Sequence, residues 1–524
     1  MVSRWQSKVV ICKGGLVLDT DALTQGTVTP GSARILQNYE PALEGGYRRI
    51  DGYSKYDSAE LATGSDKKVY GVKVAFSGVF AYADTGTSND YRLHYSTGSG
   101  WADVSGAARS TTAPGKARFV SYYMGEERLV MVDGKDEAVR YNGTTSGDQT
   151  LIDGSGSGSG TPPADPKFCE YFLGRLCLAG YSSNPSAVTL SAPNDDLKFS
   201  GVDGAVEVNV GDIIVGIKTF RDTLYVFCRN SIYKIVEDVG TSFAVLDVAK
   251  SIGCIATDSI QELGGDLTFL APDGLRSVAA TERIGDIELA LLSRRIQPFI
   301  KPLIASVTND NFSSCTIRRK SQYRSFKFDS SITESSTLGV LGKLEPTEAG
   351  ISYEWSTLKG IQPYCCDSFY DGSDEVVVFG HPSDGYVYQL ESGNNFDGDE
   401  ISAVYSSPQI TFDDATIRKV LHKADIYTQV EGSIETDLSV LFDFQETDKI
   451  QPPSQTIATA AGGSTYGSAV YGTSSYGILE FPVFRKSLHG SGFTAAFKYT
   501  SSTSDKASHR IDSYQITYSP KGRK

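Results

Sequence analysis

The side chains that most often perform catalysis or hold metals are sparse in this sequence and lie far apart. The five histidines are His94, His381, His422, His489 and His509, and none is within five residues of another. Zinc sites need histidine and cysteine ligands at short, regular spacings. The sequence therefore gives no indication of a metal site, and we predict that the protein uses no metal ion and no other cofactor.

Sequence motifs of the common enzyme classes are missing too. No Gly-x-x-x-x-Gly-Lys-Ser/Thr, strand-linked Gly-x-Gly-x-x-Gly, Gly-x-Ser-x-Gly or His-Glu-x-x-His segment occurs, so nucleotide binding and the usual hydrolase reactions have no local support. Residues 96–101 lack the aspartate of a sialidase Asp-box, and residues 394–400 lack the glycine position of a calcium-binding loop. A glycosidase needs two carboxyl groups at a defined separation, which the sequence does not reveal. We predict no catalytic residue and no enzymatic turnover.

The cysteine pattern indicates a reducing environment. Eight cysteines are scattered along the chain, and Cys365 and Cys366 are neighbours, which suits buried free thiols better than a disulfide framework. No stretch reaches the roughly 18 apolar residues of a membrane-spanning helix, and the early run Val9–Cys12 is too short for the core of a signal peptide. We therefore expect synthesis in a cytoplasm, without export and without a membrane anchor.

The charge balance argues against a protein that grips nucleic acid. Lys and Arg total 49 against 63 Asp and Glu, a formal net charge of −14, so the surface as a whole repels phosphates. Short basic clusters occur at residues 48–49, 294–295 and 318–320. We interpret them as partners for nearby carboxylates and not as a DNA-binding patch.

The elements that must position any functional residue are β-strands. Glycine contributes 53 residues, Tyr 29 and Phe 24, but there are only 3 Met, a balance that favours strands and tight turns. The chain has 524 residues, 40% of them hydrophobic, enough for two or more domains with full cores. Apolar residues alternate in runs such as 72–76, 79–82 and 91–95, separated by short turns, as in antiparallel hairpins. We predict an all-β fold.

The hairpin groups recur at a nearly constant spacing. When the first inner strand of each group is taken as its anchor, successive anchors are 45, 49, 49, 43, 55 and 49 residues apart. The anchors are Val74, Phe119, Phe168, Ile217, Ile260, Cys315 and Tyr364. Four-stranded propeller blades repeat every 40–50 residues, roughly, so we predict a β-propeller of six or seven blades over residues 58–400. A pair of β-sandwiches whose strands repeat by chance is the alternative.

Two segments interrupt the repeat. Residues 153–163 form a Gly/Ser tract without apolar residues, for which we predict a mobile loop between blades. Its glycines are Gly154, Gly156, Gly158 and Gly160. Between residues 281 and 304 the apolar residues Leu289, Leu292, Ile296 and Phe299 follow helical spacing. We predict a short amphipathic helix there, ended by Pro298 and Pro302.

After about residue 400 the spacing is lost and longer strands begin. The expected strands are 401–412, 420–427, 433–444, 477–484, 494–499 and 513–518. They predict a C-terminal β-sandwich over residues 401–524, with an edge-like final strand. A five-residue repeat places Tyr466, Tyr471 and Tyr476 each before a glycine. An irregular surface loop and an exposed aromatic contact surface are both consistent with that repeat.

The first 57 residues follow neither pattern. Turn residues at 14–15, 29–31 and 51–52 surround short apolar pieces, which predicts an extended N-terminal arm that is ordered only when docked on a larger body. Because the arm and the C-terminal domain both offer strands that could pair, we expect them to form a docking platform together. We also expect that removal of residues 1–57 leaves a folded propeller.

Several segments resemble the tail hub, or nozzle, family of short-tailed bacteriophages, also called packaged-DNA stabilisation proteins. As in the opening of those proteins, the arm has an Asn-Tyr-Glu segment followed by Gly-Gly-Tyr-Arg-Arg. The matching residues are Asn38, Tyr39, Glu40, Gly45, Gly46, Tyr47, Arg48 and Gly52. Residues 215–233, 252–254 and 267–275 are similar to the middle of the family, and 412–420 to its C-terminal segment.

The resemblance implies a structural virion protein that is made in the host cytoplasm and resides in the virion tail. Six copies would form a homohexameric ring below the portal and its adaptor. The implied partners are adaptor or head-to-tail connector proteins, tail fibre or tailspike proteins, and double-stranded DNA that passes without sequence-specific binding. An acidic lumen suits such passage because it repels phosphates. The Gly/Ser tract and the tyrosine repeat are the candidate contact or gate loops.

Two other function classes are consistent with the sequence. A carbohydrate-binding or depolymerising β-propeller would contain an aromatic-lined groove with paired acids. A periplasmic or surface adhesion propeller would need an export signal, which residues 1–15 do not supply.

Overall fold

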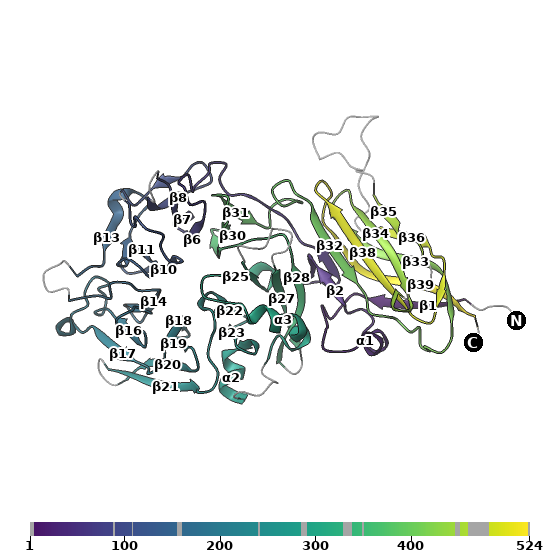
Figure 1. Ribbon diagram of the computed structural model, residues 1–524, viewed down its shortest axis with the longest axis horizontal. Coiled ribbons are helices and arrows are strands. Elements are labelled where there is room, and N and C mark those ends of the chain that lie inside the picture. The colour runs from purple at the N-terminus through teal and green to yellow at the C-terminus, as the bar shows by residue number, and fades with distance from the viewer. Residues whose placement is uncertain are drawn as a thin grey trace.

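The computed structural model describes residues 5–86, 90–106, 108–154, 160–238, 242–284, 291–328, 338–347, 350–445, 451–459 and 482–521. Regular structure in these ranges is almost entirely β-sheet, which confirms the predicted fold class. Figure 1 shows a ring of small sheets at one end of the molecule and two large sheets at the other. The first and last strands, β1 (Gln6–Ile11) and β39 (His509–Pro520), both lie in the large sheets.

Six small sheets form the blades of a β-propeller (Figure 1). The first blade contains β6 (Val69–Ala75), β7 (Gly78–Asp84), β8 (Tyr91–Ser96) and β9 (Ala102–Asp103), and the second contains β10 (Arg118–Tyr123), β11 (Glu127–Val132), β12 (Val139–Tyr141) and β13 (Gln149–Leu151). The third contains β14 (Phe168–Phe172), β15 (Arg175–Ala179), β16 (Ala187–Leu190) and β17 (Val206–Asn209), and the fourth contains β18 (Ile214–Phe220), β19 (Thr223–Cys228), β20 (Ile232–Glu237) and β21 (Phe243–Ala249). The fifth contains β22 (Gln261–Leu263), β23 (Asp266–Ala271) and β24 (Gly274–Ser277), and the sixth contains β29 (Cys365–Asp371), β30 (Asp374–Gly380), β31 (Val387–Leu390) and β5 (Tyr53–Lys55).

One strand of a larger sheet occupies a seventh position of the ring, between the fifth and sixth blades. This strand, β25 (Phe312–Ile317), contacts β22 on one side and β29 on the other. Val74, Phe119, Phe168, Ile217 and Cys315 lie in β6, β10, β14, β18 and β25, and Ile260 and Tyr364 directly precede β22 and β29. The anchors chosen from the sequence therefore mark the innermost strand at every position of the ring.

Burial and turn geometry explain why the blades form where they do. The second strand of the first blade, β7, is buried at every position, as expected for a strand covered on both faces. Phe76 and Ser77 connect it to β6 with positive φ angles of 52° and 55°, the conformation of type I′ turns, whose twist matches that of the paired strands. Leu173 and Gly174 make the same kind of turn in the third blade, with φ angles of 45° and 74°.

The N-terminal arm completes the sixth blade. Its strand β5 pairs antiparallel with β31, with Tyr53 opposite Leu390. The ring of Tyr53 stacks on that of Phe396 with centroids 4.9 Å apart. Removal of residues 1–57 would therefore take a strand and a buried aromatic residue from the propeller, which contradicts the expectation that the propeller stays intact without them.

The two large sheets pack face to face as a β-sandwich. The nine-stranded sheet runs in the order β25, β26 (Gln322–Lys327), β27 (Leu338–Thr347), β28 (Gly350–Leu358), β2 (Ile35–Gln37), β32 (Ile401–Ser406), β38 (Ala495–Thr503), β34 (Glu435–Phe442) and β35 (Gln455–Ala458). The seven-stranded sheet contains β3 (Tyr39–Pro41), β4 (Tyr47–Arg49), β39, β33 (Lys419–Val430), β36 (Val483–Ser487), β1 and β37 (Ser491–Gly492). Tyr499 of the first sheet and Tyr514 of the second meet between the layers with ring centroids 6.0 Å apart.

The last strand is not an edge strand, contrary to the sequence-based expectation. β39 pairs with β33 on one side and with β1 and β4 on the other. The arm supplies β1 and β4, so its backbone covers the side of β39 that would otherwise face solvent. The arm is thus ordered by strand pairing, as predicted for a docked segment.

Three short α-helices occur in the described ranges: α1 (Ala22–Val28), α2 (Val278–Ile284) and α3 (Gln297–Ile304). The single helix predicted between residues 281 and 304 is wrong, because α2 and α3 are separate. Pro298 lies in the first turn of α3 and Pro302 lies inside the helix. A proline in the first turn costs no intrahelical hydrogen bond, because the N–H at that position has no partner within the helix. Leu289 lies outside the described residues. No helix among those described is long and apolar enough to cross a membrane.

Candidate functional site

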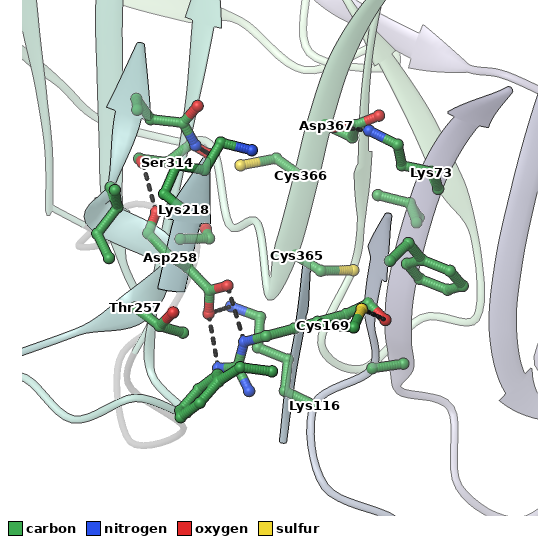
Figure 2. Close-up of a pocket in the computed structure, with 18 of the residues that line it drawn as sticks. Lys73, Lys116, Cys169, Lys218, Thr257, Asp258, Ser314, Cys365, Cys366 and Asp367 are labelled. Atoms are coloured by element: carbon green, nitrogen blue, oxygen red, sulfur yellow. Dashed lines mark hydrogen bonds and ion pairs between the residues drawn. The ribbon is translucent and has the colours of Figure 1, made fainter. Parts of the chain in front are cut away.

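A cavity of about 190 Å³ lies at the centre of the propeller, where the innermost strands converge (Figure 2). Each of the seven ring positions contributes to its lining. The charged residues of the lining are Lys73, Lys116, Arg118, Glu170, Lys218, Asp258 and Asp367. Such a concentration of ionisable groups makes the cavity the first place to look for chemistry.

The carboxylates of the cavity are paired with cations from other blades. Asp258, in the short turn η3 (Thr257–Ser259) before β22, lies 3.0 Å from Lys116 Nζ and 3.0 Å from Arg118 Nη2. Arg118 lies in β10 of the second blade and Lys116 two residues before it, so these contacts cross the ring; Figure 2 shows Lys116 beside Asp258. Lys73 of the first blade lies 3.1 Å from Asp367 of the sixth. These ion pairs fasten the inner strands to one another.

The surroundings of Asp258 and Lys218 favour the charged form of each side chain. Burial by itself raises the pKa of Asp258, but the positive charges of Arg118 and Lys116 outweigh burial and hold the pKa below its usual value. Lys218 Nζ lies 3.1 Å from Glu170 Oε2, joining the fourth blade to the third. The carboxylate of Glu170 raises the pKa of Lys218 although burial opposes it. At neutral pH Asp258 and Lys218 are therefore charged.

Three cysteines, Cys169, Cys365 and Cys366, also line the cavity. Burial raises the pKa of the Cys365 thiol to about 12 and raises the pKa of the other two as well. Protonated thiols are poor nucleophiles and poor metal ligands. Within the described parts of the chain, no group of three or more His, Cys, Asp or Glu residues is arranged to hold a metal ion.

The arrangement of the cavity accounts for cohesion of the ring. A glycosidase uses one carboxyl group as an acid and a second carboxyl group, without a cationic partner, as a base or nucleophile. The carboxylates described above all have cationic partners. The cavity, at about 190 Å³, is also far too small to hold duplex DNA.

The arm residues that carry the family resemblance meet at the junction of propeller and sandwich. Glu40 is only 2% exposed. Its carboxylate lies 3.2 Å from Arg48, 2.8 Å from Lys320 and 3.0 Å from Arg324, and Gln322 donates a hydrogen bond to it at 2.9 Å. Burial alone raises the pKa of Glu40, but the neighbouring cations outweigh burial and lower the pKa to about 2.

Glu40, Arg48, Lys320 and Arg324 form a junction cluster. Other carboxylates extend this cluster into the propeller and into the sandwich. Arg324 lies 2.8 Å from Glu391, which directly follows β31 of the sixth blade. Arg48 lies 2.7 Å from Asp51 and 2.7 Å from Glu431, which directly follows β33 of the sandwich. The arm therefore links blade and sandwich through a set of opposite charges that is buried at Glu40, Arg324 and Glu391 and reaches solvent at Glu431.

The remaining polar residues of the arm motif anchor backbone and side chains nearby. Asn38 donates hydrogen bonds to two carbonyl oxygens, one after β28 and one in β32, each at 2.9 Å. Tyr39 Oη lies 2.8 Å from His509 Nε2. Burial and the nearby arginines lower the pKa of His509 to about 3, so the ring is neutral, and its tautomer sets which of the two groups donates this hydrogen bond. Tyr47 Oη donates to the carbonyl of Gly31 at 2.8 Å.

The glycines of the motif are needed for backbone geometry. Gly45 and Gly46 have φ angles of 94° and 81° in the turn between β3 and β4, a region that favours glycine. A Cβ atom on Gly52 would lie 1.8 Å from the carbonyl oxygen of Asn395. The arm motif therefore builds a structural junction, and this is the role the structure supports for it.

The predicted gate loops are described only in part. Gly154 and Gly160 flank the Gly/Ser tract, which connects β13 of the second blade to β14 of the third, as predicted. Gly160 forms a bridge with Phe199, in the connection between β16 and β17, so this end of the tract lies near the outer strands of the ring. Gly156, Gly158, Tyr466, Tyr471 and Tyr476 lie outside the described residues.

Sequence reasoning missed most members of the junction cluster. Part of its signal was the alternation of Gln322 and Arg324, which places two polar side chains on one face of β26, while Lys320 lies in the turn before that strand. The interpretation of basic clusters as carboxylate partners is confirmed for Arg48 and Lys320. Arg49 instead donates to backbone carbonyls at 2.7 and 2.9 Å.

Comparisons with known proteins give no family for this chain. No family model matches it, and no curated protein matches it. Among solved structures it is similar to an exo-β-1,3-galactanase from Phanerochaete chrysosporium with galactose, at 12% identity over 90% of this chain and 100% of that chain, with a TM-score of 0.26. It is also similar to the AfRom2 CNH domain, at 10% identity over 66% of this chain and 100% of that chain (TM-score 0.37), and to BBS1N in complex with ARL6DN, at 10% identity over 65% of this chain and 96% of that chain (TM-score 0.37). At these sequence identities and TM-scores, the similarities support no inference about function.

Proposed function

We propose that this chain is a structural virion protein, one subunit of a ring-shaped tail hub or nozzle of a short-tailed bacteriophage. In this role the ring attaches below the portal and its adaptor, retains packaged DNA and lets it pass into the host. The sequence resemblance of the arm motif suggests the family, and the β-propeller with a sandwich built partly from the arm is compatible with it. The proposal assigns the protein no enzymatic activity.

The observation that carries this proposal is the distribution of exposed apolar side chains. Seven of the twenty exposed large hydrophobic side chains in the described ranges lie between residues 5 and 43. They are Trp5, Val9, Ile11, Leu23, Val28, Ile35 and Leu43. Five of them lie in β1, α1 and β2, and Trp5 and Leu43 lie just outside strands; contiguous apolar patches at a surface are typical of protein–protein contacts. We assign this surface of the arm to contacts with a second copy of the chain and with the adaptor.

The DNA path in this proposal runs between subunits. The centre of each propeller holds only a cavity of about 190 Å³ that is lined by ion pairs, so the channel would be enclosed by a ring of six chains, each with a formal charge of −14. Such a lumen repels phosphates and allows duplex DNA to slide. Retention then comes from constriction, for which residues 154–160 and 466–477 are the candidate segments.

Assembly tests the proposal directly. Ile11 is 67% exposed and Val28 is 72% exposed, so the double variant Ile11→Asp/Val28→Asp should fold and melt like the parent protein. It should fail to form rings and to enter tails, as judged by native mass spectrometry with and without the adaptor. Val202→Asp is the matched control, because Val202 is 98% exposed on the propeller. Normal incorporation of the double variant would overturn the proposal.

DNA behaviour provides an independent test. The isolated protein should bind duplex DNA negligibly at physiological salt, and particles without it should package DNA and then lose it. Tight binding that weakens steeply with salt would show that a basic surface holds the DNA directly. Reproducible polysaccharide hydrolysis that is abolished by substitution of one acidic residue would contradict the assignment as a non-enzyme.

A further inference from the structure

A groove of about 460 Å³ lies where the first hairpins of three neighbouring blades end. Its walls are the turns between β6 and β7, between β10 and β11, and between β29 and β30. Three aromatic side chains that line it are exposed: Tyr123 by 72%, Phe369 by 49% and Tyr370 by 43%. The groove has the size of a small-ligand site, and no part of the proposed function uses it.

The aromatic surface of the groove is held in place by its surroundings. Tyr122 stacks on Tyr171 with centroids 4.4 Å apart and planes 4° from parallel, and its hydroxyl donates to Asp196 at 2.6 Å. Lys73 Nζ lies 5.8 Å from the ring centroid of Phe369. Tyr122 is buried, so its contacts fix the backbone of the wall that carries Tyr123, and a wall that is fixed before binding loses little entropy when a ligand arrives.

Two carboxylates, Glu127 and Asp371, line the same groove, and none of its lining residues is a lysine or arginine. In the described part of the chain, neither carboxylate makes a side-chain hydrogen bond or ion pair. They come from different blades but act on one phenol: burial raises the pKa of Tyr95, and the charges of Asp371 and Glu127 raise it further. The groove thus combines aromatic faces with free acceptors.

We propose that this groove binds a neutral oligosaccharide segment. The faces of aromatic rings are electron-rich and attract the C–H faces of sugar rings. Ionised carboxylates can only accept hydrogen bonds, so the ligand must supply donors, which sugar hydroxyls do. Because the charged residues that line the groove are the carboxylates Glu127 and Asp371, acidic sugars, phosphates and nucleic acid are repelled from it.

Peptide ligands fit this chemistry less well. A proline-rich peptide also docks on aromatic grooves, but it presents carbonyl acceptors and few donors. The carboxylates of the groove would then have no hydrogen-bond donor. A lysine-rich peptide would supply donors, yet its binding would depend on charge and would weaken with salt. Salt dependence therefore separates a cationic ligand from a neutral sugar.

The experiment is saturation-transfer NMR on the full-length protein with maltohexaose, cellohexaose, a β-1,3-linked glucohexaose and a β-1,4-linked galactohexaose. Sialyllactose and tetralysine serve as the acidic and cationic probes. At least one neutral hexasaccharide should bind, with little change between low and high salt. Tyr123→Ala and Phe369→Ala should each weaken that binding by about tenfold or more. Tyr427→Ala and Phe444→Ala are the matched controls, since these rings are 38% and 58% exposed elsewhere, and they should bind like the parent protein.

Three results would overturn the proposal. One is the absence of binding to every neutral hexasaccharide at about 10 mM, a concentration that reveals even very weak sites. Another is unchanged binding in Tyr123→Ala and Phe369→Ala with unaltered melting temperatures. The third is binding of tetralysine alone that disappears at high salt. The proposal does not depend on the virion role, because assembly is tested by variants of the arm.

Discussion

Glu40→Gln is the sharpest test of the idea that the arm motif is a structural junction. The substitution keeps the size of the side chain and removes its charge. Arg48, Lys320 and Arg324 then lose a carboxylate that lies within 3.2 Å of each of them. Because Glu40 is almost fully buried, water cannot replace the lost partner.

The size of the effect follows from two independent considerations. Removal of one partner from a buried ion pair costs about 3–5 kcal/mol. The junction lowers the pKa of Glu40 from its usual 4.5 to about 2, and a shift of this size corresponds to about 3 kcal/mol of extra stability when the group is ionised. We therefore expect Glu40→Gln to lower the free energy of unfolding by about 3–5 kcal/mol at pH 7.

The effect should depend on pH in one direction. The pKa of Glu40 is lower in the folded than in the unfolded protein, so its contribution is complete above about pH 4.5 and is lost as the pH falls towards about 2. Glu40→Gln has no such group. The difference in stability between parent and variant should therefore shrink between pH 5 and pH 2, about the interval that separates the two pKa values.

The assay is urea unfolding followed by near-ultraviolet circular dichroism at pH 7, 5 and 3. Glu44→Gln is the matched control, because Glu44 lies in the same arm and pairs with Arg510 while its side chain is 75% exposed. An exposed pair of this kind should cost about 0–1 kcal/mol. The reasoning is refuted if both variants cost the same at pH 7, or if the Glu40→Gln deficit does not change with pH.

Further predictions concern the cavity, a turn and the thiols. Asp258→Asn should lower the free energy of unfolding, measured by urea unfolding, by about 3–5 kcal/mol, because two cations of the cavity lose their carboxylate. Asp505→Asn, at a side chain that is 72% exposed, should cost under about 1 kcal/mol in the same assay. Gly46→Ala should destabilise more than Gly45→Ala, since a Cβ on Gly46 would lie 2.7 Å from its nearest neighbour and one on Gly45 would meet nothing within 4 Å; equal melting temperatures would contradict this. Seven of the eight free cysteines are buried, so Ellman's reagent should titrate at most one thiol in the native protein and all eight in guanidinium.

The sequence determined the local parts of this fold. Alternation of apolar residues with a period of two is a property of each strand, and positive-φ turns join neighbouring strands, so both can be recognised without knowing the rest of the chain. For this reason the anchors from Val74 to Tyr364 mark the innermost strands correctly. The helical interpretation of residues 281–304 was wrong because spacing alone does not reveal where a proline begins a helix instead of ending one.

Only the tertiary structure decided which distant segments meet. Tyr53 pairs opposite Leu390 and Val9 opposite Gln515, and nothing in either local sequence specifies these partners, because backbone hydrogen bonds look alike in every strand. Glu40 and Arg324 are 284 residues apart, so their ion pair exists only once the propeller and the sandwich have placed both strands. An ion pair forms only when its charged atoms come within about 4 Å of each other, and hence the chemistry of this site was fixed by topology and not by sequence spacing.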